Sequence, residues 1–402
     1  MIPVSEAIGV VIEKAEPLAS ERVPLDEAQG RVLAEDVYAD TDLPPFDRAQ
    51  MDGYAVRSAD LRETPARLRV VGEAAAGSGW RGTLGAGEAL RIMTGAPLPA
   101  GADSVQQVEV TRELEGGALV ELERATAPGQ FYVPRGSEIT AGERVLEAGE
   151  EVTAARAAVL ASFGYAEVPV YVRPRVAVLA TGTELVPAGE RPGEDQIRDS
   201  NSYSLAAYAR LAGAVVERMP FAGDDPGLLR REVEAAAARS DVLVLSGGVS
   251  MGRYDFTKAA LHALGAEVFF ERVALRPGKP TVFARLPGGA LVFGLPGNPV
   301  SVSVTFNLFA RTALRRMQGA REAAPAEETA VLARAAKGAA ERASYLPAAL
   351  KTDGEGRLLA EPLKWGGSSD FVAFARATAL VIVPAGEKFE AGSVVKVVRL
   401  PG

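Results

Sequence analysis

The sequence predicts a multidomain protein in which a central, doubly wound α/β domain is accompanied by β-rich domains. Between residues 173 and 320, apolar strand-like runs alternate with helical runs, the pattern of a mostly parallel sheet covered by helices. On either side, glycine and proline separate shorter β-type runs. The 402 residues also exceed one ordinary hydrophobic core, so about two to four domains are expected.

The same patterns give the expected domain limits. Residues 1–45 are typical of a helical and then extended segment, which we expect to pack with residues 141–172. Residues 46–140 predict a β-rich domain, because glycine and proline recur between its β-type runs. Residues 173–320 predict the α/β domain, and residues 321–402 predict a separate C-terminal β domain.

The order of elements in the α/β region indicates where a ligand should bind. Strands are expected at residues 175–180, 215–219, 241–245, 268–273, 281–284 and 290–293. Helices are expected to begin at Asn201 or Ser202, at Asp225, at Asp255 and at Asn298. Sheets of this kind bind ligands at the carboxyl ends of their strands. Three segments that follow strands can therefore converge on one edge: Thr181–Glu184, Ser246–Ser250 and Leu295–Pro299.

The composition narrows the possible chemistry. The chain has no cysteine, which excludes disulfides, iron–sulfur clusters, thiolate zinc sites and cysteine nucleophiles. Its single histidine, His262, lies in a helical run with no motif nearby, so we interpret it as a residue of a helix surface. The polar groups that remain are carboxylates, hydroxyls, basic side chains and backbone amides. These groups suit phosphate chemistry and hard cations such as Mg2+.

Charge and apolar pattern indicate the class of partner. A net charge of −8 argues against nucleic acid, which needs a broad basic surface. No run of about 18 or more apolar residues occurs, so no membrane span is expected. The first residues, Met1–Glu6, lack the basic and then apolar pattern of a secretory signal. We therefore expect a cytoplasmic protein that acts on a small molecule.

A glycine pair follows the third strand of the α/β region. Two glycines permit backbone amides to turn toward a ligand, and two serines add hydroxyl donors, which suits a phosphate or a sulfur-bearing anion. A tight strand–helix turn without a ligand explains the same spacing equally well. The candidate binding residues are Ser246, Gly247, Gly248 and Ser250.

Three carboxylates near strand ends are candidate Mg2+ ligands. Glu184 follows a threonine-rich turn, and Asp224 precedes Asp225, which is better placed to cap the next helix. Asp255 follows the glycine pair and could serve as a metal ligand or only as a helix cap. Together on one rim, Glu184, Asp224 and Asp255 would bind a hard cation through oxygen.

Basic residues gather in and before a proline-bounded turn. Arg272, Arg276 and Lys279 supply local positive charge and predict an anion clamp, with ordinary surface residues as the alternative, most of all for Arg272. A second rigid turn follows a strand and opens a helix, where the helix dipole favours an anion. Its candidate residues are Pro296, Gly297 and Pro299.

Six motifs together resemble one known family, although the first two, taken as isolated loops, would be interpreted as structural. The motifs are Pro44–Asp47 with Met51–Ala55, Ile92–Ala96, Thr181–Leu185, Ser246–Ser250, Pro277–Pro280 and Gly294–Pro299. Their order and approximate spacing are similar to those of the molybdopterin molybdenumtransferases, which include MoeA and the E domain of gephyrin. One such motif would be weak evidence, and six in order are strong.

The resemblance implies a fold of four domains: a helical/extended stalk domain, a β-rich domain, the α/β domain and a C-terminal small β-barrel domain. It implies a homodimer in which the loops around Asp52 and Thr94 face the α/β domain of the partner subunit. The implied reaction is Mg2+-dependent hydrolysis of adenylylated molybdopterin with insertion of molybdate into the dithiolene, releasing AMP. Transient contact with the adenylylating enzyme and with molybdoenzymes is also implied.

The resemblance also implies the site residues. Glu138 stands where the family usually has Asp, and Arg276 stands where Lys is common. Both changes keep the charge, but arginine is a planar fork and lysine a point charge. Ser368, taken as a cofactor-binding residue, and Arg342 match only loosely. The implied catalytic positions are Asp52, Thr94, Glu138, Glu184, Asp224 and Asp255.

Two alternative functions stay open. A related adenylyltransferase shares the α/β domain and its Ser-Gly-Gly loop, but it has no need for residues 46–140 and 321–402. A non-catalytic scaffold of the gephyrin E type would use this fold to bind a receptor peptide. The four acidic residues Asp52, Glu184, Asp224 and Asp255 argue against such a loss of catalysis.

Overall fold

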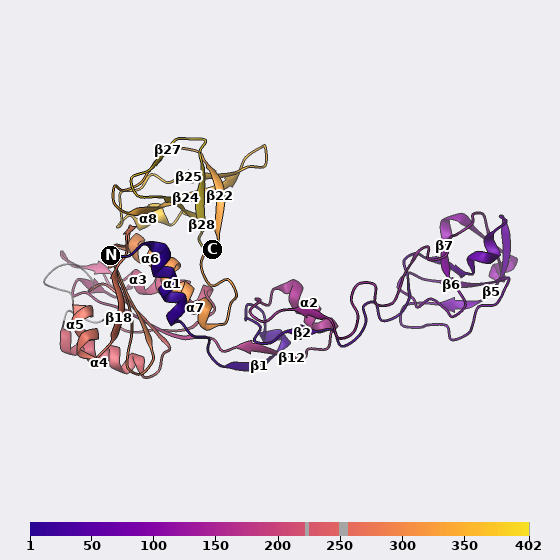
Figure 1. The fold of residues 1–402 in the computed structure, drawn as a ribbon, viewed down its shortest axis with the longest axis horizontal. Helices are drawn as coiled ribbons and strands as arrows, with labels where there is room; N and C mark the ends of the chain where they lie inside the picture. The colour runs from indigo at the N-terminus through magenta and orange to yellow at the C-terminus, as the bar shows by residue number, and fades with distance from the viewer. Residues whose placement is uncertain (222–224, 249–255, 402) are drawn as a thin grey trace. The chain divides into compact units, whose positions relative to one another are not determined.

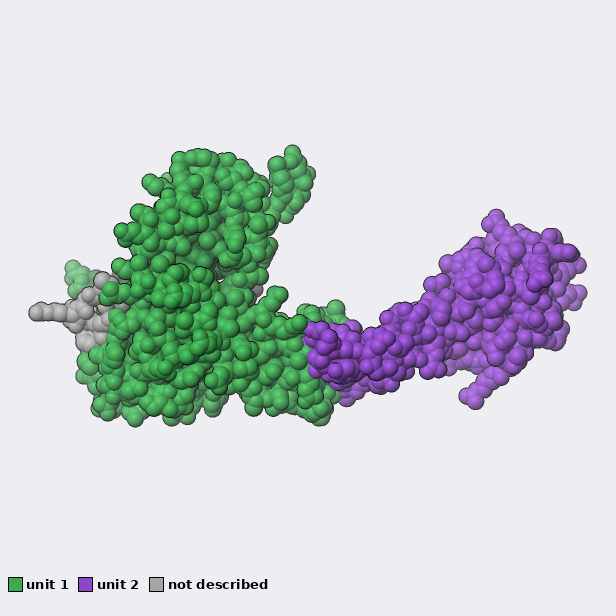
Figure 2. Space-filling view, viewed as in Figure 1, with its two compact units in different colours: residues 1–35, 148–157, 167–402 green, residues 36–147, 158–166 purple. Residues whose placement is uncertain are grey.

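The computed structural model describes residues 1–221, 225–248 and 256–401. The chain forms two compact units, drawn in different colours in Figure 2. Unit 1 comprises residues 1–35, 148–157 and 167–402, and unit 2 comprises residues 36–147 and 158–166. Unit 2 is therefore an insertion in the sequence of unit 1. Within the described ranges, no helix is long and apolar enough to cross a membrane.

The centre of unit 1 is a sheet of six strands (Figure 1). In spatial order they are β16 (Val215–Arg218), β13 (Arg175–Ala180), β17 (Val242–Ser246), β21 (Leu291–Leu295), β20 (Pro280–Arg285) and β18 (Glu267–Arg272). The first four run parallel, and β20 and β18 are antiparallel to their neighbours. The continuous apolar run of β13 is buried except at its first residue, as expected of a parallel strand covered on both faces.

Helices cover both faces of this sheet, which confirms the doubly wound fold (Figure 1). Alternate residues of β13 divide between the two cores, as the period of two requires: Val176 and Val178 join the first, and Ala177 and Leu179 the second. The first core is covered by α1 (Val4–Lys14), α3 (Asn201–Leu211), α6 (Pro299–Thr305), the π-helical η5 (Phe306–Ala310) and α7 (Arg311–Met317). The second is covered by α4 (Pro226–Ala237) and α5 (Phe256–Ala263).

The C-terminal part of unit 1 is a closed barrel, which confirms the barrel that the family resemblance implies. Its strands, in order around the barrel, are β24 (Ala343–Thr352), β25 (Leu358–Pro362), β22 (Glu327–Leu332), β28 (Val394–Arg399) and β26 (Ala379–Val383). The barrel closes because β24 pairs with both β25 and β26. The short strand β19 (Leu275–Arg276) of the α/β domain pairs with the start of β24 and connects the two domains.

Shorter elements complete unit 1. The bridge between Ile2 and Val273 ties the N-terminal segment to the end of β18. The pairs are β1 (Ser20–Pro24) with β12 (Glu167–Tyr171), β14 (Leu185–Val186) with β15 (Ile197–Arg198), and β23 (Ala336–Lys337) with β27 (Lys388–Phe389). The short helices are η1 (Leu25–Glu27) and α8 (Phe371–Phe374). The limits given above for the four domains remain a prediction.

Unit 2 is built on a second six-stranded sheet, so this part of the chain is β-rich as predicted. Both faces are covered: Ala55 packs into one core, and its neighbours Tyr54 and Val56 pack into the other. The strands, in order, are β7 (Ser104–Gln107), β4 (Gly53–Val56), β6 (Glu88–Ile92), β5 (Ala66–Ala74), β9 (Leu119–Leu122) and β8 (Thr111–Leu114). Shorter pairs are β3 (Arg48–Ala49) with β10 (Tyr132–Val133) and β2 (Val37–Tyr38) with β11 (Arg144–Leu146). In unit 2, 3-10 turns cover Ser58–Leu61, Val108–Val110 and Glu115–Gly117. Helix α2 (Ala154–Ser162) has residues 154–157 in unit 1 and residues 158–162 in unit 2.

Candidate functional site

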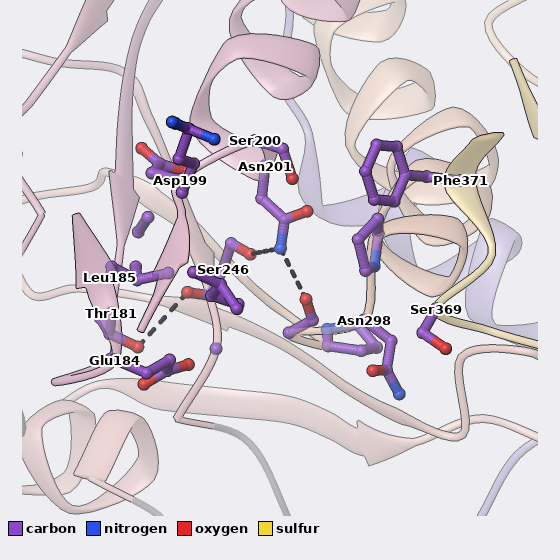
Figure 3. Close-up of a pocket in the computed structure, with 18 of the residues that line it drawn as sticks. Thr181, Glu184, Leu185, Asp199, Ser200, Asn201, Ser246, Asn298, Ser369 and Phe371 are labelled. Carbon is purple, nitrogen blue, oxygen red and sulfur yellow. Dashed lines mark hydrogen bonds between the residues drawn. The ribbon is translucent and has the colours of Figure 1, made fainter. Parts of the chain in front are cut away.

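A cavity of about 1170 Å3 lies at the carboxyl edge of the α/β sheet (Figure 3). The segments that follow β13, β17 and β21 form its walls, together with the first turn of α3 and residues next to α8. We call it the strand-edge cavity. The predicted convergence of the three segments is confirmed for their described residues, which exclude Ser250. The predicted site residues that line the cavity are Glu184, Ser246, Gly247, Gly248, Pro296, Gly297 and Pro299.

The glycine pair makes a tight turn at the end of β17. Gly247 and Gly248 have φ angles of 97° and 64°, which glycine adopts without strain. A Cβ on Gly247 would lie 2.6 Å from the Thr181 carbonyl oxygen, and one on Gly248 would lie 2.6 Å from Thr257 Oγ1. The Gly247 N–H donates to the last carbonyl of β21 at 3.1 Å, so this amide is used inside the turn. Close packing alone therefore accounts for both glycines.

Asn201 connects the strand-end segments, although the sequence predicted it only as a possible helix start. Its Nδ2 donates to Ser246 Oγ at 2.9 Å and to the Gly297 carbonyl at 2.6 Å, as Figure 3 shows. Because Ser246 Oγ accepts this bond, its own proton remains available to a ligand in the cavity. The sequence offered one signal for this role, an amide side chain at the start of the helix that follows the first strand. Ordinary helix caps show the same pattern.

Glu184 is the proposed metal ligand that falls within the described ranges. Its side chain is exposed and lines the strand-edge cavity. A Cβ on Gly182 would lie 2.4 Å from Glu184 Oε2, so the glycine lets this carboxylate fold back over the turn. An exposed carboxylate oxygen at a cavity wall fits Mg2+. Asp224 and Asp255 lie outside the described residues, and within those ranges no cluster of three or more acidic or histidine side chains could hold a metal.

A second cavity, of about 740 Å3, lies between the α/β domain and the barrel. Four cationic side chains line it: Arg276 and Lys279 from the proline-bounded turn, and Lys337 and Arg342 from the barrel. None of the described residues that line it is acidic. We call it the basic cavity. The structure thus adds Lys337 and Arg342 to the predicted anion clamp. No sequence motif marked Lys337.

Strand pairing holds the two halves of the basic cavity together. Arg276 lies opposite Ser344 in the pairing of β19 with β24, and Arg342 Nη1 donates to the Leu275 carbonyl at 3.3 Å. Uncompensated positive charge in a concave site favours a small anion. Arg272, the last residue of β18, is exposed and is not among the described residues that line either cavity.

The two cavities share a wall. Pro280, Pro296 and Asn298 line both of them, and Asn298 supplies the polar side chain of this wall. Its Nδ2 donates to Ser368 Oγ at 3.0 Å, and the Ser368 carbonyl accepts from the Val300 N–H at 3.0 Å. Ser368 lines the basic cavity, so this predicted residue lies where the two cavities adjoin.

The remaining predicted residues belong to unit 2, where the structure brings two of them into contact. The N–H and the hydroxyl of Thr94 both donate to Asp52 Oδ1, at 2.6 and 2.8 Å. The backbone bond first, and then the hydroxyl bond, lower the pKa of Asp52, so its carboxylate stays ionised at neutral pH. Glu138 is exposed and lies near a different group, with its Oε1 3.7 Å from Arg48 Nη2.

Three family models match the chain in order along its length. Residues 2–164 match the MoeA N-terminal region (domain I and II). Residues 177–316 match a probable molybdopterin binding domain, and residues 329–400 match the MoeA C-terminal region (domain IV). The matches therefore include both compact units.

Similar proteins agree with these matches over nearly the whole chain. A molybdopterin molybdenumtransferase of Bacillus subtilis (strain 168) is 36% identical, over 99% of this chain and 94% of its own length. A protein of the same name from Nostoc sp. is 37% identical, over 95% of this chain and 89% of its own length. The crystal structure of a molybdopterin biosynthesis MoeA protein from Pyrococcus horikoshii OT3 is similar, with a TM-score of 0.85 at 29% identity over both full chains.

Proposed function

The chain belongs to the MoeA family of molybdopterin molybdenumtransferases, and from this premise we propose that it inserts molybdate into the dithiolene of molybdopterin. Its place is in molybdenum cofactor biosynthesis, as a transferase. In the proposed reaction adenylylated molybdopterin is hydrolysed, molybdate enters the dithiolene and AMP leaves. The observation that carries the proposal is the pair of adjoining cavities, one large and lined by both hydroxyl and aromatic side chains, the other lined by four cations.

The strand-edge cavity is the proposed site for adenylylated molybdopterin. Its volume, about 1170 Å3, exceeds that of a typical drug-sized pocket, as a substrate with a pterin, two phosphates and a nucleoside requires. Ser246 can donate its hydroxyl proton to a phosphate oxygen while it accepts from Asn201. Pro296 and Pro299 keep the third strand-end segment rigid, which reduces the ordering entropy lost on binding.

Glu184, with Asp224 and Asp255, is the proposed ligand set for Mg2+. The bound cation would neutralise charge on the phosphates of the substrate during hydrolysis. The exposed Glu184 carboxylate on the cavity wall is the described residue that supports this assignment.

The basic cavity is the proposed entry site for molybdate, a small dianion. Arg276 presents a planar fork of donors, and Lys279, Lys337 and Arg342 present further positive charge. A charge-assisted hydrogen bond contributes about 1.5–3 kcal/mol, so several of them suffice to hold the oxyanion. The shared wall at Asn298 places it next to the proposed pterin site.

Two of the cations also distinguish this proposal from the adenylyltransferase alternative. Lys337 and Arg342 belong to the barrel, so the basic cavity exists only when the α/β domain and the barrel are both present. An enzyme that only transfers AMP to molybdopterin has no use for this cavity.

Turnover tests the proposal directly. The purified chain is incubated with adenylylated molybdopterin, Mg2+ and molybdate, and both AMP and cofactor formation are measured, the latter by reconstitution of a molybdenum-free apoenzyme. We expect both products to appear, with cofactor formation dependent on molybdate. A parallel incubation with molybdopterin, ATP and Mg2+ tests the alternative: formation of adenylylated molybdopterin there would indicate the adenylyltransferase. No turnover in either incubation would indicate the scaffold.

Asp52, Thr94 and Glu138 are proposed to complete the site from the other subunit of a homodimer. The support is the family resemblance together with the ionised Asp52 carboxylate, which accepts hydrogen bonds from the N–H and the hydroxyl of Thr94. Mixing an Asp52→Ala variant with a Glu184→Ala variant should restore part of the activity, because hybrid dimers contain one intact site. Well-mixed subunits that recover no activity would contradict a shared site.

A further inference from the structure

Two aromatic side chains line the strand-edge cavity without being part of a hydrophobic core. Tyr203 on α3 is 46% exposed, and Phe371 at the start of α8 is 50% exposed. Hydroxyls and backbone turns form another part of the same cavity, around Ser246. A ligand that covers both regions must combine a flat apolar ring with a polar, phosphate-like part.

A chain of hydrogen bonds positions a cation on one face of the Tyr203 ring. The Asp199 carboxylate accepts from the Ser202 N–H at 3.0 Å and from the Ser202 hydroxyl, and both of these residues are buried. Ser202 Oγ in turn accepts from Arg218 Nη1 at 3.3 Å, and the Arg218 guanidinium lies 3.7 Å from the centre of the Tyr203 ring. One face of the ring is therefore covered by a fixed cation.

Phe371 is held by its own short helix. The Asp370 side chain accepts from the Ala373 N–H at 3.1 Å and from the Gly366 N–H at 2.8 Å, which fixes the turn on which Phe371 stands. Figure 3 shows Phe371 on the side of the cavity opposite Leu185. An aromatic ring fixed at a cavity wall and left half exposed offers a ready face for stacking.

We propose that Tyr203 and Phe371 form a stacking subsite for a planar heteroaromatic ring of the substrate. The inference rests on the proposed function, because that substrate carries two such rings, a pterin and an adenine, joined through phosphates. Both rings have the same stacking chemistry, and stacking of a base on an aromatic side chain changes affinity by about 5- to 100-fold. The two residues would act in binding, not in the chemical step.

Three probes of the intact protein test the subsite: AMP, 6-hydroxymethylpterin phosphate and ribose 5-phosphate, which has no ring system to stack. Calorimetry should show that the wild-type protein binds at least one ring-bearing probe about 5- to 100-fold more tightly than ribose 5-phosphate. Phe371→Leu and Tyr203→Leu should remove most of this advantage and leave ribose 5-phosphate affinity unchanged. Phe371→Tyr and Tyr203→Phe should retain it.

Tyr38→Leu is the matched control, because Tyr38 is 47% exposed and belongs to unit 2. A selective loss with AMP assigns the subsite to adenine, and a selective loss with the pterin probe assigns it to the pterin. Equal binding of all three probes by the wild-type protein would overturn the subsite but leave the proposed function standing. Failure of all three to bind would also overturn the subsite, and the turnover assay would then decide the proposed function separately. Leucine variants that alter the oligomeric state without altering probe affinity would show a protein contact instead, and would also overturn it.

Discussion

The strand-edge cavity is lined mainly by turns, hydroxyls and apolar rings of the α/β domain, whereas the basic cavity is lined by four cations from two domains. The first suits a large ligand recognised at many points, each of modest strength. The second suits a small ligand recognised mainly by charge, through charge-assisted hydrogen bonds. Because Pro280, Pro296 and Asn298 line both, the comparison can be tested with changes on either side of one wall.

The largest effect is expected from Glu184→Gln, which keeps the size of the side chain and removes its charge. AMP release should fall by at least about 100-fold, because a metal ligand contributes several kcal/mol of transition-state stabilisation. Molybdate affinity should stay unchanged, since Glu184 does not line the basic cavity among the described residues. Single-turnover AMP release and calorimetry with molybdate measure the two effects, with the exposed Glu190→Gln as control. Normal AMP release by Glu184→Gln would remove this residue from the metal site.

A smaller effect is expected from Arg276→Ala and Lys279→Ala, and it should fall on molybdate use more than on AMP release. Loss of one charge-assisted hydrogen bond should raise the molybdate concentration required for cofactor formation by about 10- to 100-fold. AMP release should suffer less, because hydrolysis depends mainly on Mg2+ and the carboxylates. The measurement is a titration with molybdate in which AMP and cofactor formation are both followed. The control is Lys351→Ala, which removes an exposed barrel lysine paired with Glu361. Equal losses of both products would assign the turn to the substrate phosphates.

A modest effect on both cavities is expected from Asn298→Ala, which removes the polar group of the shared wall. Loss of its bond to Ser368 should weaken both functions by about 2- to 10-fold. Asn298→Asp keeps the shape but adds negative charge, so it should impair molybdate use more than AMP release. The same paired assays apply. An aspartate variant that impairs both equally would show that the wall serves only as a structural support.

The smallest effect is expected from Thr94→Val, which tests the stability of unit 2. The Thr94 N–H first, and then its hydroxyl, lower the pKa of Asp52 from its ordinary value, and Thr94→Val removes only the hydroxyl bond. A lowered folded-state pKa contributes stability above the ordinary pKa and loses it as pH falls through the folded value. The wild-type protein should therefore be more stable than the variant near pH 7, and the difference should shrink below about pH 4. Chemical unfolding at both pH values measures this. Thr111→Val, whose hydroxyl donates to a backbone carbonyl, should show no such pH dependence.

The sequence was sufficient for features that depend on local order along the chain. The strands of the α/β domain, the cap and proline at Asp225 and Pro226, and the convergence of three strand ends all follow from local patterns. The β-rich and barrel domains follow from glycine and proline spacing together with the family resemblance.

Features that depend on pairing between distant segments could not be predicted. Lys337 enters the basic cavity because β19 pairs with β24, and no local pattern encodes that pairing. Tyr203 on α3 lines the strand-edge cavity and stacks on Arg218, a residue of β16. The spacing of the glycine pair fits a ligand-binding turn and a tight turn equally well, and the Gly247 amide bonds to β21, a strand whose position the local sequence does not specify.

The insertion of unit 2 into unit 1 has a consequence for synthesis on the ribosome. Strand β1 pairs with β12, which begins at residue 167, so β1 waits for its partner while the whole of unit 2 is made. At about 5–20 residues per second this interval lasts roughly 7–30 s. Ser20, Glu21 and Arg22 are exposed even in the folded strand, and such polar and charged residues keep a strand without a partner soluble. A nascent chain that stops at residue 166 thus contains all of unit 2 but leaves β1 without its partner strand.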